Sequence, residues 1–242
     1  MIFAGPEVNK RVYDEMGVKQ LISPYGLTET HIGGTACALD DPLELRITTV
    51  GRPMPGVEIG IRAPNGNDFL PDGQAGEVCF RGWCITKGYF EDPEKTAEAL
   101  DENGWFRTGD IGVIRSDGCL SLVGRLKDMI RVGGENVASA DVESVLLKHD
   151  AVKQAVAVGM PDERLVEVVA VFIELKTGRQ ATEKEIIDFC RGHLASFKVP
   201  RRAKFVHEWP MTGAGKIQRY LLKESLAQGE LDFVTKRRNG ID

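Results

Sequence analysis

The sequence predicts an α+β fold in which a β-rich segment precedes a compact unit of alternating strands and helices. Residues 1–123 are rich in Gly, Pro and short alternating apolar runs, and helical periodicity appears only after Gly124. Strands alternate apolar and polar residues, whereas amphipathic helices repeat apolar residues every three to four positions. We therefore expect one domain segment at 1–123, a short connection at 124–128 and a second domain at 129–242.

The first segment contains three runs with the character of strands. Residues 56–61 and 77–80 alternate, and the runs 111–114 and 119–123 flank an Arg-Ser-Asp-Gly stretch. Asp and Gly favour tight turns, so the last two runs should form a hairpin. Only one or two short helices are expected here.

The second segment should alternate helices with buried strands. Apolar residues of 142–149 share one helical face, and 151–158 and 166–175 are apolar enough for strands buried on both sides. Thr182 begins a capping box before a second helix. Residues 219–227 suggest a third helix.

Composition argues against several classes of protein. A net charge of −5 over 242 residues gives no reason to expect a nucleic-acid partner or a membrane surface. No apolar run is long enough for a bilayer span, and the first residues lack the regions of a signal peptide. We therefore expect a cytoplasmic protein. Five cysteines without zinc-ligand spacing should be reduced core residues: Cys37, Cys79, Cys84, Cys119 and Cys190.

Two polar motifs in the first segment could bind a ligand. Residues 25–30, Tyr-Gly-Leu-Thr-Glu-Thr, combine a ring that can lie on a purine, hydroxyls that can reach a phosphate and a carboxylate suited to Mg²⁺. Residues 108–110, Thr-Gly-Asp, offer a carboxylate for two vicinal hydroxyls. Taken alone, each also fits an ordinary polar loop or turn.

Two further motifs lie in or beside the second segment. Residues 124–137 place four charges before a glycine pair, which fits either an exposed linker with a tight turn or a hinge with a ligand-binding backbone loop. Residues 210–219 place Lys216 after a Gly-rich loop, where it could bring a point charge to an anionic transition state. Ile217 stands where a P-loop needs Ser or Thr, so this is no Walker motif. The alternative is a surface loop.

The order and spacing of the four motifs resemble the adenylate-forming superfamily, which includes acyl- and aryl-CoA synthetases, firefly-type luciferases and peptide-synthetase adenylation domains. The match runs from about residue 3 to 222 and includes 51–56 and the stretch from 76–78 through 87–89. It implies that 1–123 is the C-terminal part of a large AMP-binding domain with a distorted, barrel-like end. By the same resemblance, 124–128 is a hinge and 129–242 is a small mobile domain.

The resemblance implies a nucleotide site in the first segment. Tyr25 would stack on adenine beside Gly26, and Thr28 would touch the α-phosphate. Asp110 would hold the ribose hydroxyls, with Arg125 next to it.

The resemblance also assigns residues to two chemical steps. Glu29 would bind Mg²⁺ and act with Thr28 and Lys216 in adenylation, where the lysine bridges the α-phosphate and the carboxylate. Lys127 matches the hinge.

Arg131 matches a basic position of the thioester step. Gly133 and Gly134 match the loop that replaces the lysine when the small domain rotates and that guides the thiol.

The implied function is that of an ATP-dependent acyl-CoA synthetase of fatty acid metabolism. A small-molecule carboxylic acid and ATP would give acyl-AMP and pyrophosphate, and coenzyme A would then take the acyl group. We do not find the Ser/Thr/Gly-rich phosphate loop of the family, so we expect a C-terminal part that lacks the N-terminal part of the enzyme and is poorly active alone. Two alternatives stay open: adenylation for a carrier-protein thiol, and a non-catalytic truncated module.

Overall fold

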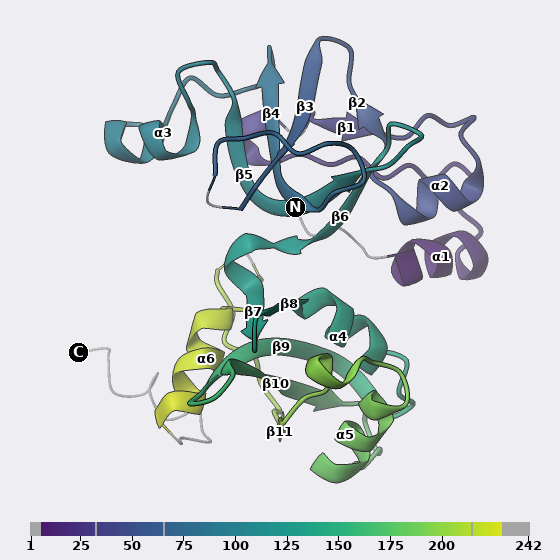
Figure 1. Ribbon diagram of the computed structural model, residues 1–242. Coiled ribbons are helices and arrows are strands. Elements are labelled where there is room, and N and C mark those ends of the chain that lie inside the picture. Colours follow the sequence, from purple (N-terminus) through teal and green to yellow (C-terminus); the bar gives the residue numbers. More distant parts are fainter. Residues whose placement is uncertain (1–5, 32, 65, 214, 229–242) are drawn as a thin grey trace. The chain divides into compact units, whose positions relative to one another are not determined.

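The structure is a computed structural model that describes residues 6–31, 33–64, 66–213 and 215–228. The chain separates into two compact units, Met1–Lys127 and Asp128–Asp242, and each is described by itself (Figure 1). Its mixture of helices and sheets confirms the predicted α+β class. Within the described ranges, the helices are too short or too polar for any of them to span a lipid bilayer.

A four-stranded antiparallel sheet forms the centre of the first unit. Its strands are β3 (Val57–Arg62), β4 (Gly76–Gly82), β5 (Phe106–Ile114) and β6 (Leu120–Arg125), in that order. The predicted hairpin is confirmed, since Ile114 faces Leu120 across its turn. The barrel-like end is corrected: closure requires the first and last strands to pair, and β3 and β6 do not pair in the described sheet.

Short elements surround this sheet. The first unit has three described α-helices rather than one or two, because the Asp92 carboxylate caps a helix that begins at Pro93 and two others lie nearer the N-terminus. The helices are α1 (Pro6–Glu15), α2 (Leu43–Thr48) and α3 (Pro93–Ala99). The unit also contains the 3₁₀ helix η1 (Thr28–Thr30) and a two-stranded sheet of β1 (Thr35–Ala36) and β2 (Arg52–Pro53).

The core of the first unit is built from the inner faces of these strands. Ile61, Val78, Phe80 and Leu120 are almost fully buried there. All five cysteines of the chain are buried free thiols, which confirms the predicted core role. Burial raises the pKa of the Cys79 thiol to about 12.

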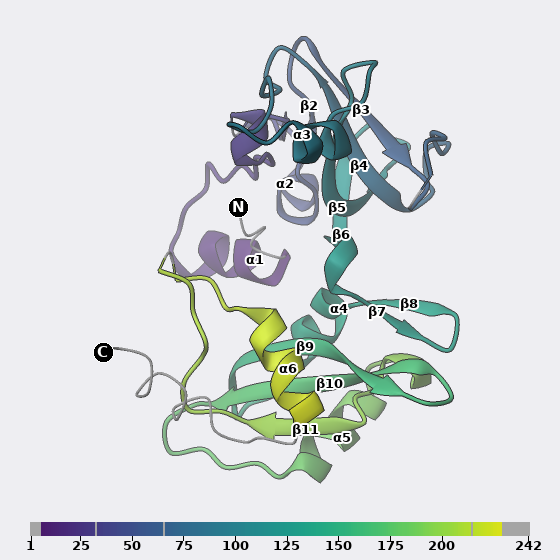
Figure 2. The ribbon, with the colours of Figure 1, turned by 90° about the vertical axis from the view of Figure 1, so that its left-hand side faces the viewer.

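The second unit is a mixed five-stranded sheet between helices. β10 (Val166–Leu175) pairs antiparallel with β9 (Val152–Asp162) and parallel with β11 (Arg202–Phe205), and the β7–β8 hairpin (Met129–Val132 and Glu135–Ala138) joins β10 at Val166. The helices are α4 (Ser139–Leu146), α5 (Glu183–Arg191) and α6 (Arg219–Gln228), with η3 at Ser196–Lys198, while η2 (Leu126–Asp128) covers the end of the first unit and the start of the second. In Figure 2, α6 crosses in front of β9 and β10.

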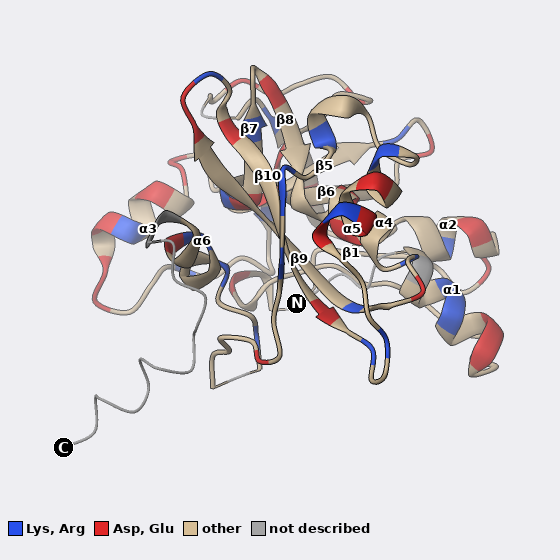
Figure 3. Cartoon of the chain, turned by 90° about the horizontal axis from the view of Figure 1, so that it is seen from below, with Lys and Arg blue, Asp and Glu red and all other residues tan. Residues whose placement is uncertain are grey.

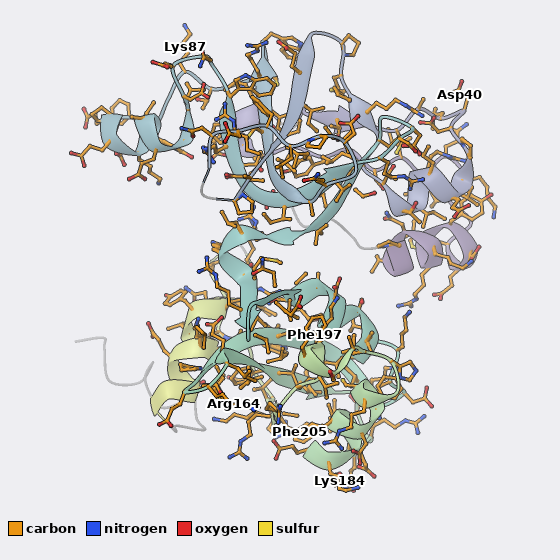
Figure 4. All side chains as sticks on the ribbon, viewed as in Figure 1. Asp40, Lys87, Arg164, Lys184, Phe197 and Phe205 are labelled. Carbon is orange, nitrogen blue, oxygen red and sulfur yellow. The ribbon has the colours of Figure 1, made fainter. Side chains whose placement is uncertain are left out.

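Burial on both faces explains why residues 168–173 of β10 are continuously apolar. Val169, Val171 and Ile173 pack in the cluster that contains α4 and α5, whereas Ala170 and Phe172 pack with α6. A strand buried on both faces has no polar side. Phe197 and Phe205, labelled in Figure 4, are partly buried against the α4–α5 cluster.

Helix α5 begins as predicted. The Thr182 side chain accepts from the backbone N–H of Glu185, and the Glu185 carboxylate accepts from the backbone N–H of Thr182. This reciprocal pair satisfies donors that the first helical turn leaves free. Acidic and basic residues are interspersed along the described chain (Figure 3).

Candidate functional site

The loop that starts at Tyr25 closes on itself. The backbone N–H groups of Tyr25 and Thr35 each donate to the other residue's carbonyl at 3.0 Å. Between them, the fully buried Thr30 hydroxyl accepts the Leu27 backbone N–H at 2.8 Å and so caps the 3₁₀ turn Thr28–Thr30. That turn leaves Thr28 exposed and Glu29 half-buried. The two residues predicted to contact phosphate and metal therefore lie on the outer side of a fixed loop.

The Thr-Gly-Asp motif is a bulge in strand β5. Between the pairs Cys79–Arg107 and Glu77–Ile111, β4 has one residue and β5 has three. Gly109 at the middle of the bulge has a φ of +68°, which favours glycine. A bulge re-aims the side chain that follows it, and here that residue is Asp110.

The structure brings three predicted nucleotide-site residues together. The Tyr25 hydroxyl donates to Asp110 Oδ2 at 2.6 Å, and Arg125 Nε lies 2.8 Å from Asp110 Oδ1. Arg125 faces Asp110 across the β5–β6 ladder, so backbone register sets this pair. Burial and the Asp110 charge raise the pKa of Tyr25 above its usual value. The phenol therefore stays a donor at neutral pH.

This cluster can still accept a diol. A carboxylate has about four lone-pair sites, and the two contacts use one on each oxygen of Asp110. The ring of Tyr25 packs against Phe80 at 5.7 Å between centroids and is only 5% exposed. It offers little open surface in this structure, so a purine stacked on Tyr25 stays a prediction.

Glu77 supports the bulge, and the sequence analysis assigned it no role. Its carboxylate accepts from the Gly109 backbone N–H at 3.1 Å and from Arg107 Nη1 at 2.6 Å. The Thr108 hydroxyl adds a bond from the Asp110 N–H at 3.0 Å. The available sequence signal was a carboxylate directly before the apolar run 78–80, since a buried Glu is almost always paired, and the structure leaves Glu77 only 4% exposed.

Tyr89 is a second missed residue, and it orients Glu29. Its hydroxyl donates to Glu29 Oε1 at 2.9 Å, while the Thr86 N–H donates to the Glu29 carbonyl at 2.7 Å. Burial and the Glu29 carboxylate raise the pKa of Tyr89. Its place in the family-like 87–89 segment was the available signal.

Glu29 fits a magnesium ion as a single protein ligand, with the other ligands coming from phosphate and water. The described residues contain no group of three or more His, Cys, Asp or Glu that could hold a metal. Mg²⁺ often takes one or two carboxylates and completes its octahedron with phosphate and water oxygens. Glu29 Oε2 has no hydrogen bond within the described ranges, so one carboxylate oxygen is available for such an ion.

In the second unit, Lys216 lies on a hydrogen-bonded turn. The Thr212 N–H donates to the Lys216 carbonyl at 2.8 Å, and the Gly215 N–H donates to the Thr212 carbonyl at 2.9 Å. Ile217 packs against the α6 cluster. The loop is thus more tightly closed than a flexible Gly-rich segment, although Ala214 lies outside the described residues. The Lys216 side chain is exposed and forms no ion pair with described residues.

The glycine pair is the turn of the β7–β8 hairpin. Gly133 and Gly134 have φ values of +58° and +93°, and Val132 pairs with Glu135 across them. A two-residue loop with positive φ at both positions is the I′ type of hairpin turn. The Gly133 N–H donates to the Leu165 carbonyl at 2.9 Å, and the turn is exposed.

Lys127 and Arg131 lie near the junction of the units. Lys127 is exposed and is the last residue of the first unit. Arg131 is exposed on β7, and its backbone N–H donates to Glu167 Oε2 at 3.1 Å. Their roles as hinge and thioester-step residues stay predictions.

Comparison with known proteins matches both parts of the chain. The model of the AMP-binding enzyme family matches residues 4–90, and that of the AMP-binding enzyme C-terminal domain matches residues 141–216.

Two curated relatives are similar over most of the chain. The mitochondrial medium-chain acyl-CoA ligase ACSF2 of Rattus norvegicus is 39% identical over 93% of this chain and 37% of its own length. The putative acyl-CoA synthetase YngI of Bacillus subtilis (strain 168) is 38% identical over 90% of this chain and 40% of its own. The chain thus spans about two fifths of the length of these relatives.

Solved structures agree. ATP-bound MatB from Rhodopseudomonas palustris has a TM-score of 0.83 at 29% identity, covering 91% of this chain and 43% of MatB. The o-succinylbenzoate CoA synthetase MenE of Bacillus subtilis, in complex with the acyl-adenylate OSB-AMP, has a TM-score of 0.82 at 29% identity, covering 91% of this chain and 44% of MenE. With both family models in the family's own order, the chain belongs to the adenylate-forming superfamily of AMP-binding enzymes.

Proposed function

We propose that this chain serves an ATP-dependent acyl-CoA synthetase. The carboxylate of an acid attacks the α-phosphorus of ATP, giving acyl-AMP and pyrophosphate. The thiol of coenzyme A then attacks the acyl carbonyl and releases AMP. The observation that carries the proposal is the Tyr25–Asp110–Arg125 cluster, a buried, charge-balanced carboxylate with free acceptor sites.

In adenylation, the first unit would bind the nucleotide. Asp110 would accept the ribose hydroxyls on its remaining lone pairs, and Thr28 would donate to the α-phosphate from its exposed position. Glu29, held by the Tyr89 hydroxyl, would be the protein ligand of a magnesium ion, which neutralises phosphate charge when bound.

Lys216 would offset the repulsion between the two reacting anions. A compact ammonium that no carboxylate of the described residues pairs with can stabilise the charge that develops as the acid approaches the α-phosphate. That charge pattern is gone once acyl-AMP has formed, so the lysine should matter little for the thiol step.

The β7–β8 turn would serve the thiol step. A turn of two glycines presents backbone without side chains, which lets a linear thiol pass close to the chain. Arg131 would contribute positive charge near the phosphate-bearing cofactor, and Lys127 would be the pivot between the two steps.

The names of the relatives support coenzyme A as acceptor and a fatty acid as one substrate class. The rat relative is a medium-chain acyl-CoA ligase by name, so medium-chain fatty acids come first in a substrate panel. The cytoplasmic location expected from the sequence stays a prediction, because that relative is mitochondrial.

The test uses the full-length protein, which is this chain with any residues that the natural protein carries beyond it. ATP–pyrophosphate exchange is measured with a panel of carboxylic acids, and AMP release is then measured with coenzyme A or with a carrier-protein thiol. Exchange followed by CoA-dependent release supports the proposal. Release only with a carrier thiol would favour the first alternative, and no exchange with any acid would favour a non-catalytic module.

A further inference from the structure

Arg219 connects several parts of the second unit through one guanidinium group. Its Nη1 and Nη2 donate to the two oxygens of Glu143 on α4 at 2.6 and 3.1 Å, and Nη1 also donates to the Ala157 carbonyl on β9 at 3.0 Å. Its Nε lies 3.8 Å from Asp128 Oδ2. A two-pronged pair with a carboxylate fixes direction as well as distance.

Asp128 is the first residue of this unit and follows Lys127 directly. It is held twice: its side chain faces Arg219, and its carbonyl accepts from the Ser139 hydroxyl at 2.7 Å. On the other side of the junction, Arg125 is held in the first unit by its pair with Asp110 at 2.8 Å. Only Leu126 and Lys127 lie between the two anchored positions.

The same arginine follows the Lys216 turn. The Gln218 N–H donates to the Pro210 carbonyl at 2.7 Å, which closes the base of the turn next to Arg219. Ile217, between Lys216 and this base, packs against the α6 cluster. Little free chain therefore separates the ammonium-bearing residue from the guanidinium.

We propose that Arg219 is a positioning residue that makes the end of the hinge and the Lys216 turn parts of one rigid body. It would touch no substrate and act through Lys216. Motion about Leu126 and Lys127 would then carry Lys216 as a fixed attachment rather than as a loose loop. The expected effect on acyl-AMP formation rests on the proposed function. The rigid link itself rests only on the contacts of Arg219.

The charge of Arg219 is secure in this setting. Partial burial opposes a charged guanidinium, but the hydrogen bonds and charge of Glu143 outweigh it and raise the pKa of Arg219. Lysine cannot reproduce the two-pronged contact, since its ammonium is a single point charge. Arg219→Lys keeps the charge but not the geometry, so it should slow acyl-AMP formation about as much as a neutral substitution does. This result would show that geometry, rather than charge, matters at this position.

The catalytic test compares half-reactions in the full-length protein. Arg219→Gln should slow acyl-AMP formation by about ten- to a hundredfold, since misplacement of about 1 Å can cost that much, with the KM for ATP little changed. Arg219→Gln added to Lys216→Ala should cause no further loss. Lys153→Gln, which removes a pair with Glu174 at 2.5 Å in the same sheet, is the control and should leave the rate unchanged.

Hydrogen exchange tests the structural half without any catalysis. Arg219→Gln and Glu143→Gln should each speed exchange of the Gly215 and Lys216 amides and of the β7 segment that follows Asp128, while α5 keeps its protection. If wild-type protein forms no acyl-AMP, the proposed function fails and this exchange pattern still tests the rigid body. Additive losses in the double variant, or unchanged exchange in these segments, would overturn the role of Arg219.

Discussion

The two candidate regions differ in how their charges are satisfied. In the first unit, Asp110 is 7% exposed and each of its oxygens already has a donor. In the second unit, Lys216 is exposed and has no ion pair within the described ranges. A group that holds a neutral diol can be preformed and balanced, whereas a group that meets transient negative charge is more effective without a competing carboxylate. The comparison predicts that the two regions fail in different ways when altered.

The largest effect should come from Lys216→Ala. Loss of one preorganised charge-stabilising group typically costs on the order of 10²–10³ in rate, so acyl-AMP formation should fall by about that factor. Attack of coenzyme A on supplied acyl-AMP should be nearly unchanged. The two half-reactions are measured separately on the same variant. A fall in both would mean that Lys216 serves structure or binding, and a surface lysine without a role would alter neither.

Asp110→Asn should affect both half-reactions. It removes the charge that faces Arg125 and a strong acceptor for the Tyr25 hydroxyl. A hydrogen bond to a charged group contributes about 1.5–3 kcal/mol, so the KM for ATP and for acyl-AMP should rise roughly ten- to a hundredfold. Asp117→Asn is the matched control, because Asp117 pairs with Arg115 at 3.0 Å on a turn of the same unit. Equal effects from both variants would show that Asp110 is not part of the nucleotide site.

The glycine turn should separate stability from chemistry. Alanine at either position must adopt a positive φ, which costs about 1–3 kcal/mol. A Cβ on Gly133 would also lie 2.9 Å from Leu165 Cδ2, whereas one on Gly134 meets nothing within 4 Å. Urea unfolding should therefore show a larger decrease in the free energy of unfolding for Gly133→Ala than for Gly134→Ala. A selective slowing of the thioester step by Gly134→Ala would tie the turn to that step, and unchanged rates would leave it only structural.

The smallest effect is expected from Tyr89→Phe. The change removes one hydrogen bond to Glu29 and leaves the ring in place. A typical net value of about 0.5–1.5 kcal/mol predicts a two- to tenfold slower adenylation step. The defect should shrink at saturating Mg²⁺ if Tyr89 acts by orienting the metal ligand, and titration of the rate with Mg²⁺ measures this. A defect independent of Mg²⁺ would count against that role.

Features set by neighbouring residues were predictable from the sequence. The hairpin at 111–123, the capping box at Thr182 and strand 166–175 depend on turn chemistry and local periodicity. Strand β9 runs beyond the predicted 151–158 to Asp162, although it contains Pro161. Its long pairing with β10 extends it, and an edge strand tolerates a proline.

The supporting contacts of the site could not be predicted in this way. Motif spacing identified Tyr25, Asp110 and Arg125 as candidates, but it says nothing about which distant residues hold them. The Glu77–Gly109, Tyr89–Glu29 and Arg219–Glu143 contacts join positions 32, 60 and 76 residues apart. The first of these pairs depends on the bulge in β5, the second on how a loop lies beside η1, and the third on the packing of α6 near α4, none of which a local pattern encodes.

The buried thiols make the protein its own reporter of unfolding. Cys37, Cys79, Cys84 and Cys119 belong to the first unit and Cys190 to the second, and all five are shielded from solvent. Alkylation requires an exposed thiolate, and burial raises the pKa of Cys190 to about 11. Each thiol therefore reacts only when its surroundings open. Comparing the alkylation rate of Cys190 with the rates of the other four thiols would show whether the two units unfold together or one after the other.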